Sequence, residues 1–242
     1  MQATPKLIAI VGGSGAGKTW LARRLELQLQ PAVSRLSLDD FYLDRSSVPE
    51  RQRESLNYDH PRAIDWARLE KTLQHCRAGR TSAVPRYDFA THTRQPDEDL
   101  FTPMPVVMVD GLWLLVQSRI RDLFDFTIFI DCPEQLRRQR RLERDVIERG
   151  RKSMQVLTQF AETVVPMHER FVAPQAATAD IVLRHSPEPA EIENLAETIR
   201  ALMSEDEATA EEDFSLAWST GSTGIMNTVA EQFTPSLFRH HA

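Results

Sequence analysis

Hydrophobic residues along this chain fall into short continuous runs, separated by longer segments with helical spacing. The runs predict buried strands over residues 7–11, 33–38, 106–110, 126–131 and 181–183. The segments between them predict helices over residues 18–30, 64–77, 133–149, 154–172 (interrupted near Pro166) and 189–202. Strands that alternate with helices favour an α/β fold, with a doubly wound, mainly parallel sheet and helices on both of its faces.

Three segments interrupt this alternation. Residues 43–62 are polar and contain prolines, which predicts a loop. Residues 81–94 look extended, and we expect a small β insertion over about 81–105. Arginine recurs along residues 137–152, where we expect a helical lid.

The pattern decays after residue 203. We expect one domain over residues 1–203 and an acidic C-terminal tail over 204–242, which is either flexible or docks on this or another subunit. The formal net charge is −6, and the acids of residues 204–213 account for all of it. The rest of the chain therefore lacks the basic field typical of nucleic-acid-binding proteins, and we expect no nucleic-acid partner.

The composition, 41% hydrophobic and 26% charged, is typical of a globular protein. The longest apolar runs are far shorter than the roughly 18–20 residues that a membrane span needs, so we expect no membrane partner. The first residues lack the pattern of a signal peptide. Cys76 and Cys132 are isolated, which excludes a disulfide framework and a structural zinc site and favours a cytoplasmic protein.

Glycine gives the first indication of chemistry. The chain has only nine glycines, yet several of them fall within residues 12–17. Residues 12–19 (GGSGAGKT) fit G-x-x-x-x-G-K-S/T, directly after a predicted strand and before a predicted helix. This placement is that of a phosphate-binding loop, in which backbone N–H groups and the helix N-terminus cradle the phosphates of ATP. The residues expected to bind ATP are Gly12, Gly13, Ser14, Gly15, Ala16, Gly17, Lys18 and Thr19.

A divalent metal belongs to this chemistry. Lys18 is expected to reach the β- and γ-phosphates, and the Thr19 hydroxyl is expected to ligate Mg²⁺. Asp110 ends a buried run of four apolar residues, where an acid faces the same ion. We therefore expect Thr19 and Asp110 to hold Mg²⁺.

Phosphoryl transfer also needs a base. Asp39 follows the second predicted strand, at the edge of the sheet where open α/β folds bind their ligands, and it is placed to accept a hydroxyl proton. Asp40 beside it is the competing candidate. The alternative is that both residues only cap the following turn.

The arginines near residue 140 supply positive charge. Arg137, Arg141 and Arg144 share one face of a predicted helix, and Arg149 and Arg151 flank Gly150 beyond it. We expect at least two of these arginines to close over the triphosphate and exclude water. The alternative is a solvated helix whose arginines pair with its own acids, Glu143, Asp145 and Glu148.

Together these motifs resemble the uridine kinase family, within the phosphoribulokinase/uridine kinase group of P-loop kinases. The resemblance covers about residues 6–200. Its most specific part is Tyr-Asp-Phe-x-x-His-x-Arg together with Asp-His-Pro. The motifs occur in order at residues 12–19, 37–42 (SLDDFY), 57–61 (NYDHP), 85–94 (PRYDFATHTR), 144–151 (RDVIERGR) and 166–168 (PMH).

The resemblance implies a P-loop NTPase fold and a set of residue roles. Asp39 is implied to be the base for a nucleoside 5′-hydroxyl, and Asp59 to bind the ribose hydroxyls. Tyr87 and His92 would contact the base ring, although both also fit a purely structural hydrophobic hairpin. The residues implied to complete the nucleoside pocket are Arg141, Arg151 and Gln159, and those implied to act on the phosphates are Lys18, Arg144 and Arg149.

Four positions depart from the family pattern, and one of them is Trp113, which follows Asp110-Gly111 in a bulky Leu-Trp-Leu-Leu run. Asp40 stands where Ser is usual, Asp110 where Glu is usual, and Trp20 where a small residue follows the phosphate-binding loop. These departures affect the identity of the substrate more than kinase activity.

We expect ATP- and Mg²⁺-dependent phosphorylation of the 5′-hydroxyl of uridine, and of cytidine, in pyrimidine salvage. The resemblance also implies a homo-oligomer. One alternative is a kinase of the same fold that acts on another small alcohol, such as glycerate or a sugar. The other is a non-catalytic, nucleotide-binding regulatory protein. A regulatory GTPase is disfavoured because the chain has no Asn-Lys-x-Asp guanine-binding motif.

Overall fold

The computed structural model describes residues 4–53, 56–184 and 186–204. Apart from residue 204, the predicted acidic tail lies outside the described residues. In the described part of the chain, none of the helices combines the length and the apolar character that crossing a membrane requires.

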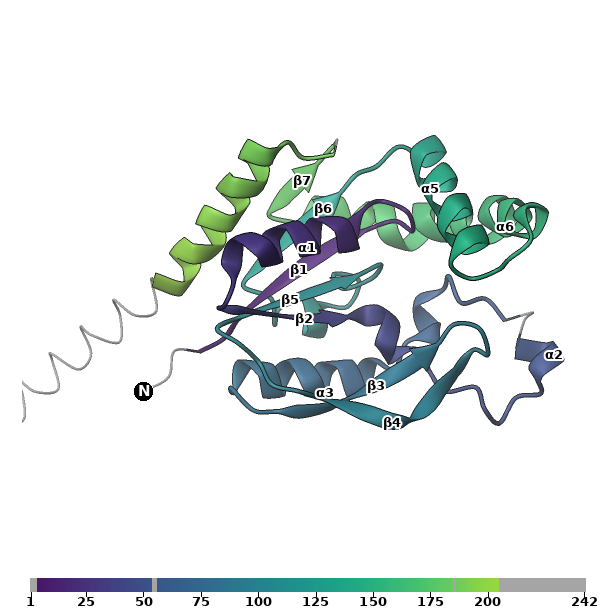
Figure 1. The fold of residues 1–242 in the computed structure, drawn as a ribbon, viewed down its shortest axis with the longest axis horizontal. Coiled ribbons are helices and arrows are strands. Elements are labelled where there is room, and N and C mark those ends of the chain that lie inside the picture. The colour runs from purple at the N-terminus through teal and green to yellow at the C-terminus, as the bar shows by residue number, and fades with distance from the viewer. Residues whose placement is uncertain (1–3, 54–55, 185, 205–242) are drawn as a thin grey trace, which may run out of the picture. The chain divides into compact units, whose positions relative to one another are not determined.

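A sheet of five parallel strands lies at the centre of the described structure (Figure 1). The strand order is β2-β5-β1-β6-β7, so β1 pairs with β5 on one side and with β6 on the other. This arrangement confirms the predicted doubly wound parallel sheet. The strands are β1 (Lys6–Gly12), β2 (Val33–Ser37), β5 (Val106–Gly111), β6 (Phe126–Ile130) and β7 (Ile181–Leu183).

Helices cover both faces of the sheet, because successive side chains of each strand point to opposite sides. Leu7, Ala9 and Val11 of β1 join one buried cluster, together with residues of α3. Ile8 and Ile10 join a second cluster, together with residues of α1 and of a helix over residues 189–204. The helices are α1 (Lys18–Leu29), α2 (Glu50–Arg53), α3 (Trp66–Arg77), α4 (Ser118–Arg121), α5 (Glu134–Ile147), α6 (Ser153–Gln159) and α7 (Val165–Met167).

A separate antiparallel hairpin, β3 (Ser82–Asp88) and β4 (Thr93–Phe101), forms the predicted insertion. It continues past residue 94, where the predicted extended segment ends, because the polar, acid-rich β4 carries no alternating pattern. Arg94 fastens the hairpin beside the sheet: its Nε donates to Tyr42 O at 2.9 Å and its Nη2 to Asp65 Oδ2 at 3.1 Å.

The prediction that the helix breaks near Pro166 is wrong. The backbone stays helical through α7, with a π-helical turn on each side of it, at Phe160–Val164 and His168–Val172. Proline removes one backbone donor, and the wider π turns shift the hydrogen-bond register around it without breaking the helix.

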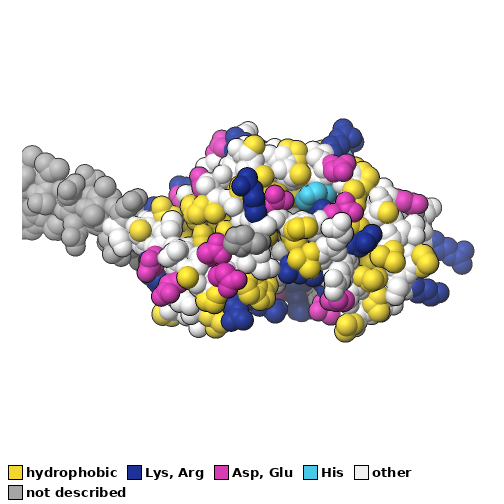
Figure 2. All heavy atoms as spheres, turned by 90° about the horizontal axis from the view of Figure 1, so that it is seen from above, with side chains coloured by type: hydrophobic (Ala, Val, Ile, Leu, Met, Phe, Trp, Pro, Cys, Tyr) yellow, Lys and Arg dark blue, Asp and Glu magenta, His cyan; other side chains and the backbone are white. Residues whose placement is uncertain are grey.

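Acidic and basic side chains of the described residues are interspersed on the face drawn in Figure 2. Figure 1 shows that α2, α5 and α6 gather at the side toward which the carboxyl ends of the strands point. Ligands bind at this edge in open α/β sheets.

Candidate active site

The phosphate-binding loop connects β1 to α1, as predicted. Gly15 and Gly17 have φ angles of +79° and +100°, in the left-handed region that favours glycine. A Cβ atom on Gly15 would also collide with the backbone carbonyl of Arg137. The loop therefore needs glycine both for its backbone conformation and for the close approach of α5.

Lys18 is buried at the start of α1, and its Nζ donates to Gly13 O at 3.0 Å. Burial lowers the pKa of Lys18, and the nearby charges of Asp39 and Asp110 oppose that shift. The structure thus brings the predicted lysine, the predicted base and the predicted metal ligand into one electrostatic neighbourhood.

Thr19 and Asp110 meet across the loop. Thr19 Oγ1 donates to Asp110 Oδ2 at 3.3 Å. Burial raises the pKa of Asp110, against the opposing charge of Lys18. Among the described residues, no three His, Cys, Asp or Glu side chains gather closely enough to hold a metal alone. A hydroxyl with one carboxylate nevertheless fits Mg²⁺, which is commonly held by one or two carboxylates and the substrate phosphates.

Asp39 and Asp40 occupy a 3₁₀ turn, Leu38–Phe41, directly after β2. Ser37 Oγ accepts from the Asp39 backbone N–H at 3.3 Å and fixes the start of this turn. The two carboxylates have different neighbours. The charge of Asp39 raises the pKa values of Lys18 and Arg149, against the effect of their burial. The charges that shift the pKa of Asp40 are those of Asp39, Asp110 and the hairpin residues Asp99 and Arg86.

Asp40→Asn is expected to stabilise the protein at neutral pH. Burial, and then the charges of Asp39 and Asp110, raise the pKa of Asp40 from 3.8 to about 6. The folded state therefore binds more protons than the unfolded state between pH 4 and 6, and stability falls as pH rises through this range. Thermal unfolding in EDTA should give the variant a Tm about 2–4 °C above the parent at pH 7, with a smaller difference at pH 5.

Asp44→Asn is the control of opposite sign. Hydrogen bonding to Ser46 lowers the pKa of Asp44. Its contribution to stability is present above pH 3.8 and is lost as pH falls through the lowered value, so this variant should be no more stable than the parent at pH 7. An Asp40→Asn variant that is less stable than the parent at pH 7 would contradict the buried-carboxylate explanation.

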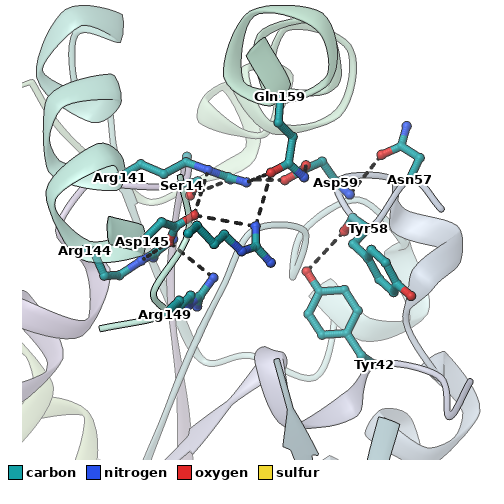
Figure 3. A network of polar contacts seen from close by, with 12 residues as sticks. Ser14, Tyr42, Asn57, Tyr58, Asp59, Arg141, Arg144, Asp145, Arg149 and Gln159 are labelled. Carbon is teal, nitrogen blue, oxygen red and sulfur yellow. Dashed lines mark hydrogen bonds and ion pairs between the residues drawn. The ribbon is translucent and has the colours of Figure 1, made fainter. Parts of the chain in front are cut away.

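Asp59 lies at the centre of a buried polar network (Figure 3). Its Oδ1 accepts from Arg141 Nη1 at 3.3 Å, and its Oδ2 accepts from Gln159 Nε2 at 3.5 Å. Arg141 also donates to Ser14 Oγ of the phosphate-binding loop at 3.1 Å, and Arg151 donates to Gln159 Oε1 at 3.2 Å. Four residues predicted for the nucleoside pocket therefore lie together, next to the loop.

Asp145 organises the arginines of α5 and of the segment after it. It is fully buried, and its carboxylate lies 2.8 Å from Arg144 Nη2, 3.4 Å from Arg149 Nη1, 3.5 Å from Arg141 Nε and 3.8 Å from Arg151 Nη1. In this structure Arg144 and Arg149 therefore contact a carboxylate of the protein, and the Arg149 guanidinium also lies 4.5 Å from the Phe89 ring centroid. The alternative, in which these arginines pair with acids of their own helix, is right for Asp145, but its carboxylate is buried and the arginines around it are only partly exposed.

Tyr87 and His92 lie in an aromatic cluster between the hairpin and the segment after β2. Tyr87 is 8% exposed and packs against Tyr42 and Phe89, each with ring centroids 5.1 Å away. His92 stacks on Tyr58 at 4.1 Å, with a φ of +56° that is uncommon outside glycine. A nonglycine residue held in this conformation is a reason to look for a function at that position.

Tyr42 links this cluster to the acids. Burial, and then the charges of Asp39 and Asp59, raise the pKa of Tyr42 well above its usual value. Its hydroxyl donates to Tyr58 O at 3.2 Å (Figure 3). Tyr42 thus lies within electrostatic range of both the predicted base and the predicted ribose-binding acid.

Arg137, one of the arginines expected in the lid, and His168, which has no role assigned from the sequence, also face the phosphate-binding loop. A Cβ atom on Gly13 would lie 2.8 Å from His168 Nδ1 and 2.9 Å from Arg137 Nη1. Both nitrogens are buried without a hydrogen-bond partner among the described residues. Burial, and then the charges of Arg137 and Lys18, lower the pKa of His168 to about 4, so its ring is neutral at pH 7. One sequence signal could have indicated a buried role for Arg137. It lies four residues before Arg141, on the same face of the helix.

A cavity of about 410 Å³ lies on the other side of the loop, where β6 and β7 end. Its wall includes Ala16 and Gly17 of the loop, Trp20 of α1 and Arg140 of α5. Asp131, the residue after β6, also lines it.

Comparison with known proteins shows which family this chain matches. The model of the phosphoribulokinase / uridine kinase family matches residues 7–190. A uridine kinase from Halobacterium salinarum is 35% identical over 206 residues, covering 85% of this chain and 92% of its own. A uridine kinase from Staphylococcus epidermidis is 39% identical over 178 residues, covering 73% of this chain and 86% of its own.

Solved structures share the fold at lower sequence identity. Phosphoribulokinase from Rhodobacter spheroides superposes with a TM-score of 0.57 at 15% identity, covering 74% of this chain and 69% of its own. This similarity agrees with the parallel sheet and the strand–loop–helix unit described above.

Proposed function

The chain belongs to the phosphoribulokinase/uridine kinase family, and we propose that it transfers the γ-phosphoryl group of ATP to the 5′-hydroxyl of uridine, and also of cytidine. The observation that carries this proposal is the buried network of Asp59, Arg141 and Gln159, placed between the phosphate-binding loop and an aromatic cluster. A neutral nucleoside needs these two surfaces, a carboxylate for the ribose diol and aromatic rings for the base.

On the acceptor side, each residue has a definite task in this proposal. Asp39 accepts the proton of the attacking 5′-hydroxyl. Asp59 accepts hydrogen bonds from the ribose hydroxyls, while Arg141 and Gln159 hold its carboxylate in place. Tyr87 and His92 contact the base ring. Arg151 positions Gln159 through the 3.2 Å hydrogen bond between them.

On the donor side, the backbone of residues 12–19 and the Lys18 ammonium bind the phosphates. Thr19 and Asp110 would hold Mg²⁺, which when bound neutralises charge on the phosphates. Arg144 and Arg149 would keep their contacts with Asp145 and direct their remaining N–H groups toward the transferred group, and so exclude water from it. The charge of Arg144 lowers the pKa of Lys18, and the charge of Asp39 raises the pKa of Arg149, so both arginines lie near the groups of the proposed reaction.

The alternatives receive less support. A sugar phosphate acceptor would need dedicated cations around its own phosphate, whereas Arg141 of the proposed acceptor pocket already pairs with Asp59 and Asp145. The similarity to solved kinases with other acceptors extends to the fold alone. A non-catalytic protein would have no need to keep Lys18, Asp39 and Asp110 in one electrostatic neighbourhood. The two cysteines, both free and buried, support a cytoplasmic location.

The test is ADP release from MgATP against a panel of uridine, cytidine, adenosine, glycerate, ribulose 5-phosphate and pantothenate. Turnover with the two pyrimidine nucleosides alone is expected. Turnover with glycerate or another non-nucleoside alcohol would retain the donor side and overturn the acceptor assignment.

His92→Ala and Tyr87→Ala are expected to raise the KM for uridine by about tenfold or more, while the Kd for ATP stays within about twofold. Each substitution removes a ring that contacts the base, and stacking on one ring is worth about 1–3 kcal/mol. Tyr87 is also part of the core, so its variant should unfold at lower temperature. Steady-state kinetics and ATP titration measure the two effects separately.

His75→Ala is the matched control for the histidine. His75 contacts Ser82 at the start of β3, whereas Tyr87 lies near the end of that strand. The control should leave both constants unchanged. Parent-like uridine kinetics in His92→Ala and Tyr87→Ala would refute the assignment of the base pocket.

A further inference from the structure

Trp20 is a large aromatic residue that the fold itself does not use. It lies in the first turn of α1 and is 44% exposed. Leu21, Leu25 and Leu29 of the same helix fill the core, and Trp20 belongs to neither of the two buried clusters. Tryptophan is highly buried on average in folded proteins, so this exposed ring directly after the phosphate-binding loop calls for an explanation.

The ring borders the cavity of about 410 Å³ beside the loop. This volume lies within the roughly 300–1,000 Å³ typical of small-molecule sites. Most of the wall is apolar, formed by Trp20, Leu21, Ile130, Pro133, Leu136 and Pro187. Such a wall suits the faces of a flat, uncharged ring.

Sheet topology separates this cavity from the acceptor residues. Asp39 follows β2 and Asp110 lies at the end of β5, and both strands are on one side of the central strand β1. The cavity lies at the ends of β6 and β7, on the other side of β1. The phosphates bind at the loop after β1, so a nucleotide that extends away from the acceptor places its base in this cavity.

Two arginines contact groups that line the cavity. Arg24, one turn along α1, has its guanidinium carbon 5.5 Å from the centroid of the Trp20 ring and restrains that ring by a cation–π contact. Arg140 donates to Ala16 O at 3.4 Å and to Ser186 Oγ at 3.3 Å, which joins the loop to the segment after β7.

We propose that Trp20 stacks on the base of the donor nucleotide in this cavity and sets a preference for purine over pyrimidine triphosphates. A purine offers the larger ring face, so stacking on tryptophan favours it. The assignment rests on the proposed function, because the donor has to occupy the phosphate-binding loop. It does not depend on which acceptor the enzyme uses.

Calorimetric titration of the full-length protein with ADP and with tripolyphosphate, both with Mg²⁺, tests the stacking contact. Trp20→Ala should weaken ADP binding about tenfold, the range expected for one aromatic–base stack, and leave tripolyphosphate binding unchanged. Trp20→Phe should keep ADP binding within about threefold. Leu27→Ala is the matched control, since it removes a 68% exposed apolar side chain from the same helix and should change neither titration.

The donor preference gives a second, independent measurement. With the best acceptor, the ratio of the KM for CTP to the KM for ATP should fall in Trp20→Ala toward one, while kcat with ATP changes little. Equal weakening of ADP and tripolyphosphate binding would mean that the substitution disturbs the loop, and unchanged ADP binding would place the base elsewhere. Either result overturns the proposal. A wrong acceptor assignment would instead leave ADP binding by the parent protein intact.

Discussion

Asp39→Asn is expected to lower kcat with uridine by about a hundredfold to ten-thousandfold while the Kd for ATP changes by no more than a few fold. A carboxamide keeps the size of the side chain but cannot accept the proton of the 5′-hydroxyl, and a positioned base contributes about 10²–10⁴ in rate. The backbone hydrogen bond from Asp39 to Ser37 is retained, so the turn after β2 should persist. Single-turnover phosphoryl transfer and ATP titration measure the two quantities.

Asp40→Asn separates the two adjacent acids. The charge of Asp40 acts mainly among Asp39, Asp110 and the hairpin, whereas Asp39 acts on Lys18, Tyr42 and Arg149. The neighbouring charges therefore favour Asp39 as the base, although the pKa of Asp40, about 6, suits proton transfer near neutral pH. We expect Asp40→Asn to keep most of its activity. A fully active Asp39→Asn with an inactive Asp40→Asn would transfer the role of base to Asp40.

Hydrophobic periodicity was sufficient to predict the fold because the three inner strands of the central sheet, β5, β1 and β6, are buried on both faces. Continuous apolar runs such as Leu7–Val11 then stand out from the helical segments, and Gly12 and Pro133 mark where β1 and the loop before α5 end. The polar strand β4 has no such signal, since its burial is confined to its ends. The length of β4 is set by its pairing with β3. This pairing cannot be recognised from the residues of one strand alone.

The phosphate side of the site was predictable from local spacing. Lys18 and Thr19 are fixed relative to the loop by the start of one helix, and Asp110 follows from the end of one strand. These relations involve neighbours in the sequence or aligned strand ends, so they need no knowledge of the tertiary fold. The roles of the individual site residues remain predictions that the variants above test.

The burial of charge was not predictable in this way. The hydrogen bond from Arg141 to Asp59 joins residues that lie 82 positions apart, and α6 brings Gln159 to the same carboxylate. Arg137, Arg141 and Asp145 are the buried residues of α5, and on a helix read alone these charges favour the solvent-facing side. A charged inner face is stable only where another element supplies its partners, which the helical pattern does not reveal.

Asp145→Ala is expected to be the most destabilising substitution in the site and to abolish turnover as well. Arg141 is itself buried, so removal of the Asp145 carboxylate leaves its guanidinium with Asp59 as its carboxylate partner and facing three further cations. Breaking one partner of a buried ion pair costs about 3–5 kcal/mol. Denaturant unfolding should show this loss. Turnover measured at 10 °C, where the variant remains folded, should still be strongly reduced, because Arg144 and Arg149 lose the group that orients them toward the phosphates.

Two further variants distinguish positioning from simple stability. Asp145→Asn keeps the shape and hydrogen-bond acceptance of one oxygen but not the charge, so it should recover part of the stability and less of kcat. Glu143→Ala removes an exposed acid from the same helix and should change stability by no more than about 0.5 kcal/mol. If Asp145→Ala unfolds at the same denaturant concentration as the parent, the arginines are solvated in solution, and α5 is the surface helix of the alternative interpretation.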